Sequence, residues 1–231
     1  MRGLRIIRHD GAENRWRVVH GDAAARLWPH VGAYAEDDET THSFMRRREM
    51  PSLRPTLILN LSAPIGIVEK AGTRFGIGTG QGFLAGLHDR PALSESSGSQ
   101  RGGHIWLSAL GAAALLGGIA ASLANQLVVL RDVLGPDVDS LAARLIDAQD
   151  SGSRFTLLDA FFERRLADAT LPCPEIIWAW NRLVTAPTPR IDRLAREIGW
   201  SQRRLAAGFV RHVGHPPRTI TLCLTENRAA L

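Results

Sequence analysis

The chain has 231 residues, 45% of them hydrophobic, and a formal net charge of +5. This length allows one large or two modest domains, and the ordinary apolar content argues against extended disorder. The N-terminal residues lack the apolar core of a signal peptide, and the two cysteines, Cys173 and Cys223, show neither metal nor redox spacing. We therefore expect a protein of the reducing cytoplasm.

Strand-like patterns dominate the first half of the chain. Residues 15–19 alternate between polar and apolar side chains, and residues 56–61 form a short apolar run that ends before Pro64. Gly- and Ser-rich turns separate further short runs of this kind. Strands are expected at residues 15–19, 56–61, 65–68, 82–87 and 103–107.

Two segments of this region have a chemical as well as a structural interpretation. Residues 76–82 read GIGTGQG but lack the Lys-Ser/Thr that completes a phosphate-binding P-loop, so a glycine-rich hairpin turn is favoured. The three arginines at 46–48, followed by Glu49, offer an anion or effector site. A solvated strand face with internal ion pairing is the favoured interpretation.

Catalytic or metal chemistry has little support in the sequence. The only candidate set of metal ligands is His88, Asp89, Glu95 and His104, and the spacing of these residues matches no known metal-binding motif. No nucleophile and base are spaced as a pair. We therefore expect no metal, no cofactor and no enzymatic activity, and an enzyme with a site in the N-terminal part stays the third alternative.

Residues 105–130 contain no charged side chain, a length that could span a bilayer. Against a membrane span stand Asn125 and Gln126 near one end, the Gly117–Gly118 pair in the middle, and the lack of a flanking basic cluster. Two short buried helices broken at the glycines are the favoured interpretation. We expect no membrane association.

Residues 137–184 have helical periodicity. Residues 137–148 and 153–167 each carry apolar side chains on one face, as two amphipathic helices would. A proline-containing joint at 171–174 separates them from a third helix at 175–184. These patterns predict an α+β fold, with a mixed strand and helix domain over residues 1–170 and an all-helical domain over residues 175–231. The joint is short, so the two domains should touch.

Residues 190–214 predict two short helices joined by a three-residue turn. In the first helix Ile191, Leu194, Ala195 and Ile198 share a face. Gly199 suits the end of that helix, because glycine adopts the left-handed conformation without steric cost. The second helix, residues 201–213, begins at the N-cap residue Ser201, and its apolar stripe is Leu205, Phe209 and Val213. This is the helix-turn-helix layout, whose second helix enters the major groove of DNA.

The charge distribution independently favours nucleic-acid binding. Residues 175–231 contain nine arginines and four acidic residues, a net charge of +5, whereas residues 1–174 carry 19 charges of each sign. Attraction to phosphates requires such an asymmetry, and solubility alone does not. An ordinary basic helical tail is the alternative.

The segment resembles the first helix-turn-helix of the AraC family of bacterial transcription regulators. It has an apolar helix, Gly199, the hydrophobic Trp200, Ser201, and a second helix that ends in Phe209 and a short basic stretch before Gly214. The motif at 215–218, HPPR, resembles the family signature that opens a long linker helix. The resemblance covers residues 175–231 well and the N-terminal sensor-like part more loosely.

The resemblance assigns DNA-contacting positions. It places Arg203, Ala206 and Ala207 toward the bases, and of these Arg203 is the best base reader because alanine makes no hydrogen bond to a base edge. Arg218 falls where the family meets a phosphate. Gly208 lies mid-helix, where glycine costs about 1 kcal/mol relative to alanine. The predicted DNA-contacting set is Ser201, Gln202, Arg203, Arg204, Ala206, Ala207 and Arg218.

One departure from the family matters for function. A DNA-binding domain of this family has two helix-turn-helix units, and this sequence reaches Leu231 within the linker helix, without a second unit. The expected function is an effector-responsive transcription regulator. The alternative is a ligand-binding or protein-interaction module whose DNA-binding part is inactive. The resemblance implies double-stranded DNA as partner and a homodimer as assembly, and adds a small-molecule effector and RNA polymerase as candidate partners.

Overall fold

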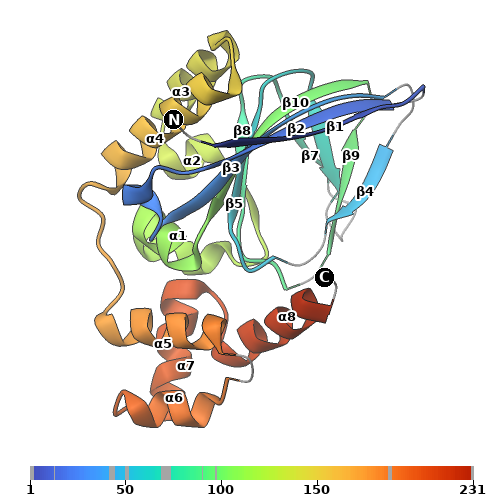
Figure 1. Ribbon diagram of the computed structural model, residues 1–231. Helices are drawn as coiled ribbons and strands as arrows, with labels where there is room; N and C mark the ends of the chain where they lie inside the picture. The colour runs from blue at the N-terminus through green and yellow to red at the C-terminus, as the bar shows by residue number, and fades with distance from the viewer. Residues whose placement is uncertain are drawn as a thin grey trace.

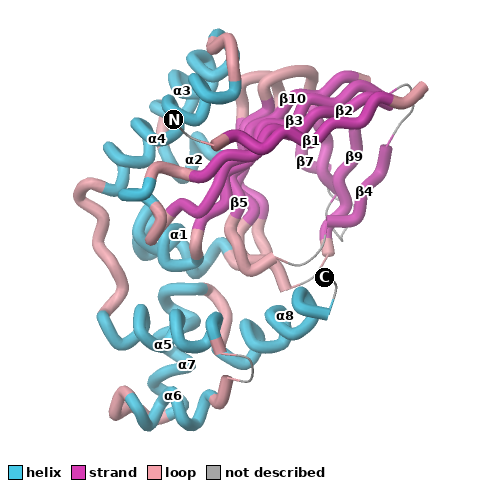
Figure 2. The backbone as a smooth tube through the Cα atoms, viewed as in Figure 1, coloured by secondary structure: helices cyan, strands magenta, loops and turns pink. Residues whose placement is uncertain are grey.

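The computed structural model describes residues 3–12, 14–41, 45–49, 52–68, 74–89, 91–96, 98–186 and 189–229. Two antiparallel sheets precede a group of helices, which gives an α+β architecture (Figures 1 and 2). The larger sheet has the spatial order β1 (Leu4–Asp10), β2 (Asn14–Asp22), β3 (Val31–Thr41), β10 (Ser99–Leu107), β5 (Thr56–Asn60), β8 (Gly82–Ala85), β11 (Leu127–Val129). The smaller sheet has the order β4 (Met45–Glu49), β9 (Ala92–Ser96), β6 (Ile65–Val68), β7 (Arg74–Ile77).

The two faces of the larger sheet have different surroundings, because successive side chains of a strand point to opposite sides. Val19, Tyr34 and Ile105 lie on one face and are at most 2% exposed. The opposite face carries both buried and half-buried side chains and faces the smaller sheet (Figure 1). Across this second face the cross-strand register aligns one row of residues, namely His20, Ala35, His104, Ile58 and Phe83.

Helices cover the apolar face of the larger sheet. α2 (Leu130–Leu134), α3 (Asp137–Asp147) and α4 (Ser151–Leu166) pack there, with Phe155 and Phe162 at 1% exposure in the shared core. Arg154 of α4 donates from Nη1 to both carboxylate oxygens of Glu36 at 3.1 Å. Because both side chains are buried, this bidentate pair compensates two charges that would otherwise be costly in the core.

The remaining helices form a second core. α5 (Pro174–Thr185), α6 (Ile191–Glu197), α7 (Gln202–Val213) and α8 (Pro217–Ala229) enclose it. Leu87 and two residues of α1 (Ala109–Leu116), Ala109 and Leu110, belong to the same apolar cluster. The sheet part and the helical part therefore touch, as the short joint predicts. The division at residues 170–175 stays a prediction, because one hydrophobic cluster crosses it.

The helix predictions are largely confirmed. The helices expected at 137–148, 153–167, 175–184 and 201–213 correspond to α3, α4, α5 and α7 within two residues at each end. The uncharged run of residues 105–130 differs in part from its prediction of two helices. Its first half contains α1, but its second half is a 3-10 helix, η2 (Gly117–Leu123), followed by β11. Within the described ranges, no helix combines the length and apolar character that a membrane crossing requires.

The strand predictions are incomplete. All five expected strands exist, and β4 corresponds to the strand face favoured for residues 46–49, but β1, β3, β7, β9 and β11 and the short 3-10 helix η1 (Ala25–Leu27) were not predicted. The glycine-rich turn is also not a hairpin. It joins β7 of the smaller sheet to β8 of the larger one, so the strands on its two sides are not hydrogen-bonded neighbours. Gly80, with φ +74°, supplies the left-handed residue that this turn requires.

Candidate functional sites

The helix-turn-helix is defined by residues that end one helix and begin the next. Gly199 has φ +69° after α6, and the Trp200 backbone N–H donates to the Ala195 carbonyl oxygen at 2.9 Å. The Ser201 hydroxyl then accepts from the Arg204 N–H at 3.2 Å and caps α7. α7 ends at Gly214, which is left-handed with φ +88°. The predicted helix boundaries, the Ser201 cap and the role of Gly199 are confirmed, and the left-handed cap at Gly214 is an additional finding.

α7 separates an apolar face from a polar one. Leu205 and Phe209 are 0% exposed and Val213 is 2% exposed, so the predicted stripe is the buried face. The opposite face is exposed and contains four of the predicted DNA-contacting residues, Gln202, Arg203, Arg204 and Ala207. Ala206 is half-buried and therefore less accessible than the resemblance implies. None of these positions has been shown to contact DNA, so their roles stay predictions.

The arginines around α7 differ in what they contact. On α6, Arg193 pairs with Glu197 at 2.6 Å, and Arg196 pairs with Asp192 at 3.2 Å. The Arg204 guanidinium lies 4.2 Å from the centroid of the Trp200 ring, a cation–π contact that fixes it over the turn.

Three exposed arginines of α7 and α8 remain available to a partner. Among the described residues, no carboxylate lies within ion-pair distance of Arg203, Arg211 or Arg218. Their charges are therefore not neutralised within this part of the chain. Burial, with Arg211 nearby, lowers the pKa of His212 and so disfavours a positive charge on that imidazole.

Arg218 lies at the other end of α7 from Arg203. α7 has 12 residues, which corresponds to about 18 Å at the rise of an α-helix. Arg218 is exposed near the start of α8. The two arginines therefore lie near opposite ends of α7.

Gly208 has a packing role that the sequence did not reveal. A Cβ atom at this position would lie 2.6 Å from Ile176 Cδ1, and Ile176 of α5 is itself fully buried. The glycine thus allows α5 and α7 to approach closely. Helix propensity alone therefore does not describe this position, because an added methyl group would displace the end of the Ile176 side chain.

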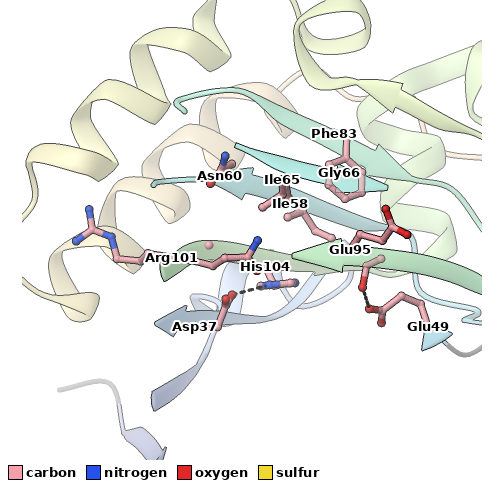
Figure 3. A pocket seen from close by; sticks show the side chains of 13 residues that line it. Asp37, Glu49, Ile58, Asn60, Ile65, Gly66, Phe83, Glu95, Arg101 and His104 are labelled. Atoms are coloured by element: carbon pink, nitrogen blue, oxygen red, sulfur yellow. Dashed lines mark hydrogen bonds and ion pairs between the residues drawn. The ribbon is translucent and has the colours of Figure 1, made fainter. Parts of the chain in front are cut away.

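A second candidate site lies between the two sheets. Adjoining hollows of about 120, 410 and 600 Å³ share Glu49 and His104 in their linings. The larger sheet contributes the second face described above, and the smaller sheet contributes Glu49 and Glu95 (Figure 3). We call these hollows together the sheet cavity.

The lining of the sheet cavity combines aromatic and ionisable groups. His104 Nε2 lies 2.7 Å from Asp37 Oδ1, and the Ser94 hydroxyl donates to Glu49 Oε1 at 2.7 Å (Figure 3). The Trp106 ring is nearly parallel to the imidazoles of His20 and His104, at centroid distances of 6.3 and 6.2 Å. Burial is the main cause that lowers the pKa of His20, with Arg5 and His104 adding to the effect. The cavity can thus hold a small organic molecule by ring contacts and hydrogen bonds.

The residues singled out as a metal set are not brought together as one. His104 faces Asp37, whereas Asp89 lies 3.9 Å from His215. Within the described ranges, no group of three or more potential ligands could hold a metal ion.

The arginine run is arranged differently from its prediction. Arg46 pairs with Glu95 on the neighbouring strand β9, its Nε lying 3.0 Å from Oε1, rather than within the run. Arg46 and Arg48 are exposed, as expected of a solvated strand face, and the Arg47 side chain lies outside the described part.

Sequence reasoning missed the sheet cavity. Trp16, Val18 and His20 alternate along β2, and this pattern was visible as a strand with one distinct face. The partners of that face come from β3 and β4, which follow β2 in the chain, and from β10, which is far away in the sequence. Pairing between distant strands has no local signal, so the cavity could not be assembled from the pattern alone.

Comparison with known proteins supports the fold. No protein-family model and no curated protein matches the sequence. Apo ToxT from Vibrio cholerae is similar with a TM-score of 0.51 at 10% sequence identity, over 85% of this chain and 81% of that chain. The AraC-like transcriptional activator CuxR has a TM-score of 0.41 at 13% identity, over 98% of this chain and 87% of its own. A second ToxT structure has a TM-score of 0.42 at 11% identity, with 81% of both chains covered. The chain thus shares its overall fold with ToxT.

Proposed function

We propose that this protein is a DNA-binding transcription regulator of the AraC type that responds to an effector. The observation that carries the proposal is the polar face of α7, exposed and basic, on a helix that is capped and packed as a recognition helix. This face lies in the part of the chain that holds all of the excess positive charge. α7 packs mainly against η2, α1, α5, α6 and α8.

Recognition divides between bases and phosphates. Arg203 lies at the start of α7, where a guanidinium can donate to O6 and N7 of one guanine. Ser201, Gln202, Arg204, Ala206 and Ala207 complete the proposed groove-facing surface. Arg218 contacts a phosphate and contributes equally to all sequences. A homodimer presents two such surfaces at half-sites about one helical turn apart.

The sheet cavity is the proposed effector site. Its volume and its mixture of aromatic, hydrogen-bonding and apolar groups suit a small molecule. We assign no catalytic step, metal or cofactor to it. A regulator of this type acts in the cytoplasm, where it reaches DNA and RNA polymerase.

Base reading by Arg203 is tested by substitution. We expect Arg203→Ala to weaken binding by about 1 to 3 kcal/mol on a preferred duplex and to relax preference at one base pair. The preferred duplex is selected first from a randomised pool, and affinities are then measured on it and on a scrambled duplex. Arg182→Ala, an exposed arginine of α5, is the control. An equal loss for Arg203→Ala on both duplexes would show that Arg203 reads no base.

The sheet cavity also favours a second candidate, a ligand-binding module without a DNA-binding role. The two candidates differ in one measurement, because only the regulator binds a duplex with salt-dependent affinity. Stabilisation by a small molecule without any duplex binding would establish the module in place of the regulator.

A further inference from the structure

We propose that residues 86–89, here called the connecting segment, couple occupancy of the sheet cavity to the position of α7, with His215 as the positioning residue on the helical side. This inference rests on the proposed function, since it concerns how the effector site regulates the recognition helix. The segment begins where β8 ends at Ala85. Its successive residues alternate between two environments.

The cavity side of the connecting segment is formed by its first and third residues. Gly86 and His88 line the hollow of about 410 Å³, together with Trp106 and Leu127. His88 Nδ1 lies 2.7 Å from the Gly86 carbonyl oxygen, and the His88 backbone makes two hydrogen bonds of 3.1 Å with Ser52. A molecule in this hollow therefore contacts a segment with a defined conformation.

The helical side is formed by the residue between them. Leu87 is 5% exposed and belongs to the apolar cluster that contains Phe209 and Val213 of α7. The Leu87 carbonyl oxygen is 3.2 Å from Nε2 of His215, which is buried just beyond the end of α7. Nδ1 of the same imidazole lies 3.9 Å from Asp89 Oδ2. One histidine thus contacts two residues of the connecting segment.

The turn after η2 joins the connecting segment to the end of α7. Asn125 donates its backbone N–H to the Leu87 carbonyl oxygen at 2.8 Å and accepts from the Asp89 N–H at 3.1 Å through Oδ1. Gly214, the C-cap of α7, is so close to the same region that a Cβ atom would lie 2.8 Å from the Ala124 Cβ. The segment, the turn and the end of α7 therefore form one continuous packed contact.

Such a contact can transmit an effector signal. Packed interfaces switch between discrete arrangements instead of deforming continuously, and a ligand shifts that balance by its different affinity for each arrangement. The N-terminal residues of α7 lie at the far end of the helix from Gly214 (Figure 1). A displacement at His215 and Gly214 therefore reorients Arg203 although no ligand contacts it. Couplings of this kind change affinity by roughly 5- to 150-fold.

The test uses a larger side chain as the probe of the cavity. His88→Trp enlarges the ring in the 410 Å³ hollow, and Gln149→Trp, at an exposed position between α3 and α4, is the control. Amide hydrogen exchange of the full chain is measured over residues 207–215. We expect His88→Trp to change exchange there by about fivefold or more, and Gln149→Trp to leave it unchanged. His88→Leu serves as a second variant if the first does not fold.

A double-mutant cycle decides whether His215 carries the effect. In the His215→Ala background, His88→Trp should no longer change exchange at 207–215, whereas His215→Gln, whose amide can donate from near the position of Nε2, should restore the response. Additive effects, or unchanged exchange at 207–215 in folded His88 variants, would overturn the inference. The same variants are titrated with a random 30-base-pair duplex. If the protein binds the duplex but His88→Trp does not change exchange at 207–215 through His215, this inference alone is rejected. If the exchange responds but the protein does not bind the duplex, the proposed DNA-binding function alone is rejected.

Discussion

At position 208 helix propensity favours alanine, whereas packing against α5 favours glycine. By propensity alone, Gly208→Ala stabilises an exposed helix by about 1 kcal/mol. Here the added Cβ atom would lie 2.6 Å from Ile176 Cδ1. We expect Gly208→Ala to give no stabilisation and Gly208→Val to destabilise the protein by about 1 to 3 kcal/mol, as overpacking does.

The cause of that effect can be isolated with a second substitution. Ile176→Val removes the Cδ1 atom that the new methyl group would meet, so Gly208→Ala should be better tolerated in that background. Urea unfolding of the two single variants and the double variant measures this coupling. A stabilising Gly208→Ala in the parent protein contradicts the packing explanation.

Phe209 is the largest side chain of the apolar face of α7. It is 0% exposed, and its ring lies 6.3 Å from that of Trp180, centroid to centroid. We expect Phe209→Ala to lower the free energy of unfolding by about 3 to 5 kcal/mol, because a buried aromatic ring is lost. Val210→Ala, at a 45% exposed neighbouring position, is the control and should have a much smaller effect. Equal losses for both variants would place Phe209 outside the core.

At the scale of elements, the turn between η1 and β3 contributes a pH dependence. Burial lowers the pKa of His30 in this turn. Because protonation is easier in the unfolded chain, stability is retained above about pH 6.5 and falls as the pH decreases through the lowered pKa of the folded state. Burial also lowers the pKa of His20 and His212, so these two histidines contribute a pH dependence of the same sign.

The contribution of His30 can be separated from that of the other histidines. We expect His30→Gln to reduce the loss of stability between pH 7.5 and pH 5.5, as measured by urea unfolding at both values. His9→Gln, at an exposed position of β1, should leave that loss unchanged. An unaltered pH dependence in His30→Gln would show that this imidazole does not titrate with folding.

The elements also show what a sequence can predict. α3, α4, α5 and α7 were predictable because each carries a local apolar period. Gly199 also marks the end of α6, and Ser201 marks the start of α7. β3 was missed because its residues include Glu36, Asp37, Asp38 and Glu39, which do not look like a strand in isolation. Tertiary contacts stabilise it instead, among them the buried pair of Glu36 with Arg154.

The two candidate sites also differ in how far the sequence predicts them. The recognition surface lies on one helix, so its exposed and buried residues followed from helical spacing. The sheet cavity joins residues from both sheets, and its composition depends on the register of strands that are distant in the sequence. Gly208 shows a third case, in which a residue identity is explained only by a neighbouring helix.

At the scale of the whole molecule, the charge asymmetry should determine how DNA affinity depends on salt. The helical part carries the excess positive charge, and Arg203, Arg211 and Arg218 are exposed without a carboxylate partner among the described residues. Each phosphate contact releases counterions, so the logarithm of the binding constant falls linearly with the logarithm of salt concentration. One helix-turn-helix gives dissociation constants of roughly 10⁻⁴ to 10⁻⁶ M at physiological salt.

The measurement that tests DNA binding most directly is therefore a titration of labelled duplex at several salt concentrations, with the parent protein and with Arg218→Ala. We expect the affinity of the parent protein to fall steeply with salt. We expect Arg218→Ala to weaken binding to all sequences equally and to reduce the slope by about one unit. The absence of binding at low salt, or an affinity that does not depend on salt, would contradict the assignment of α7 and its surroundings as a DNA-binding surface.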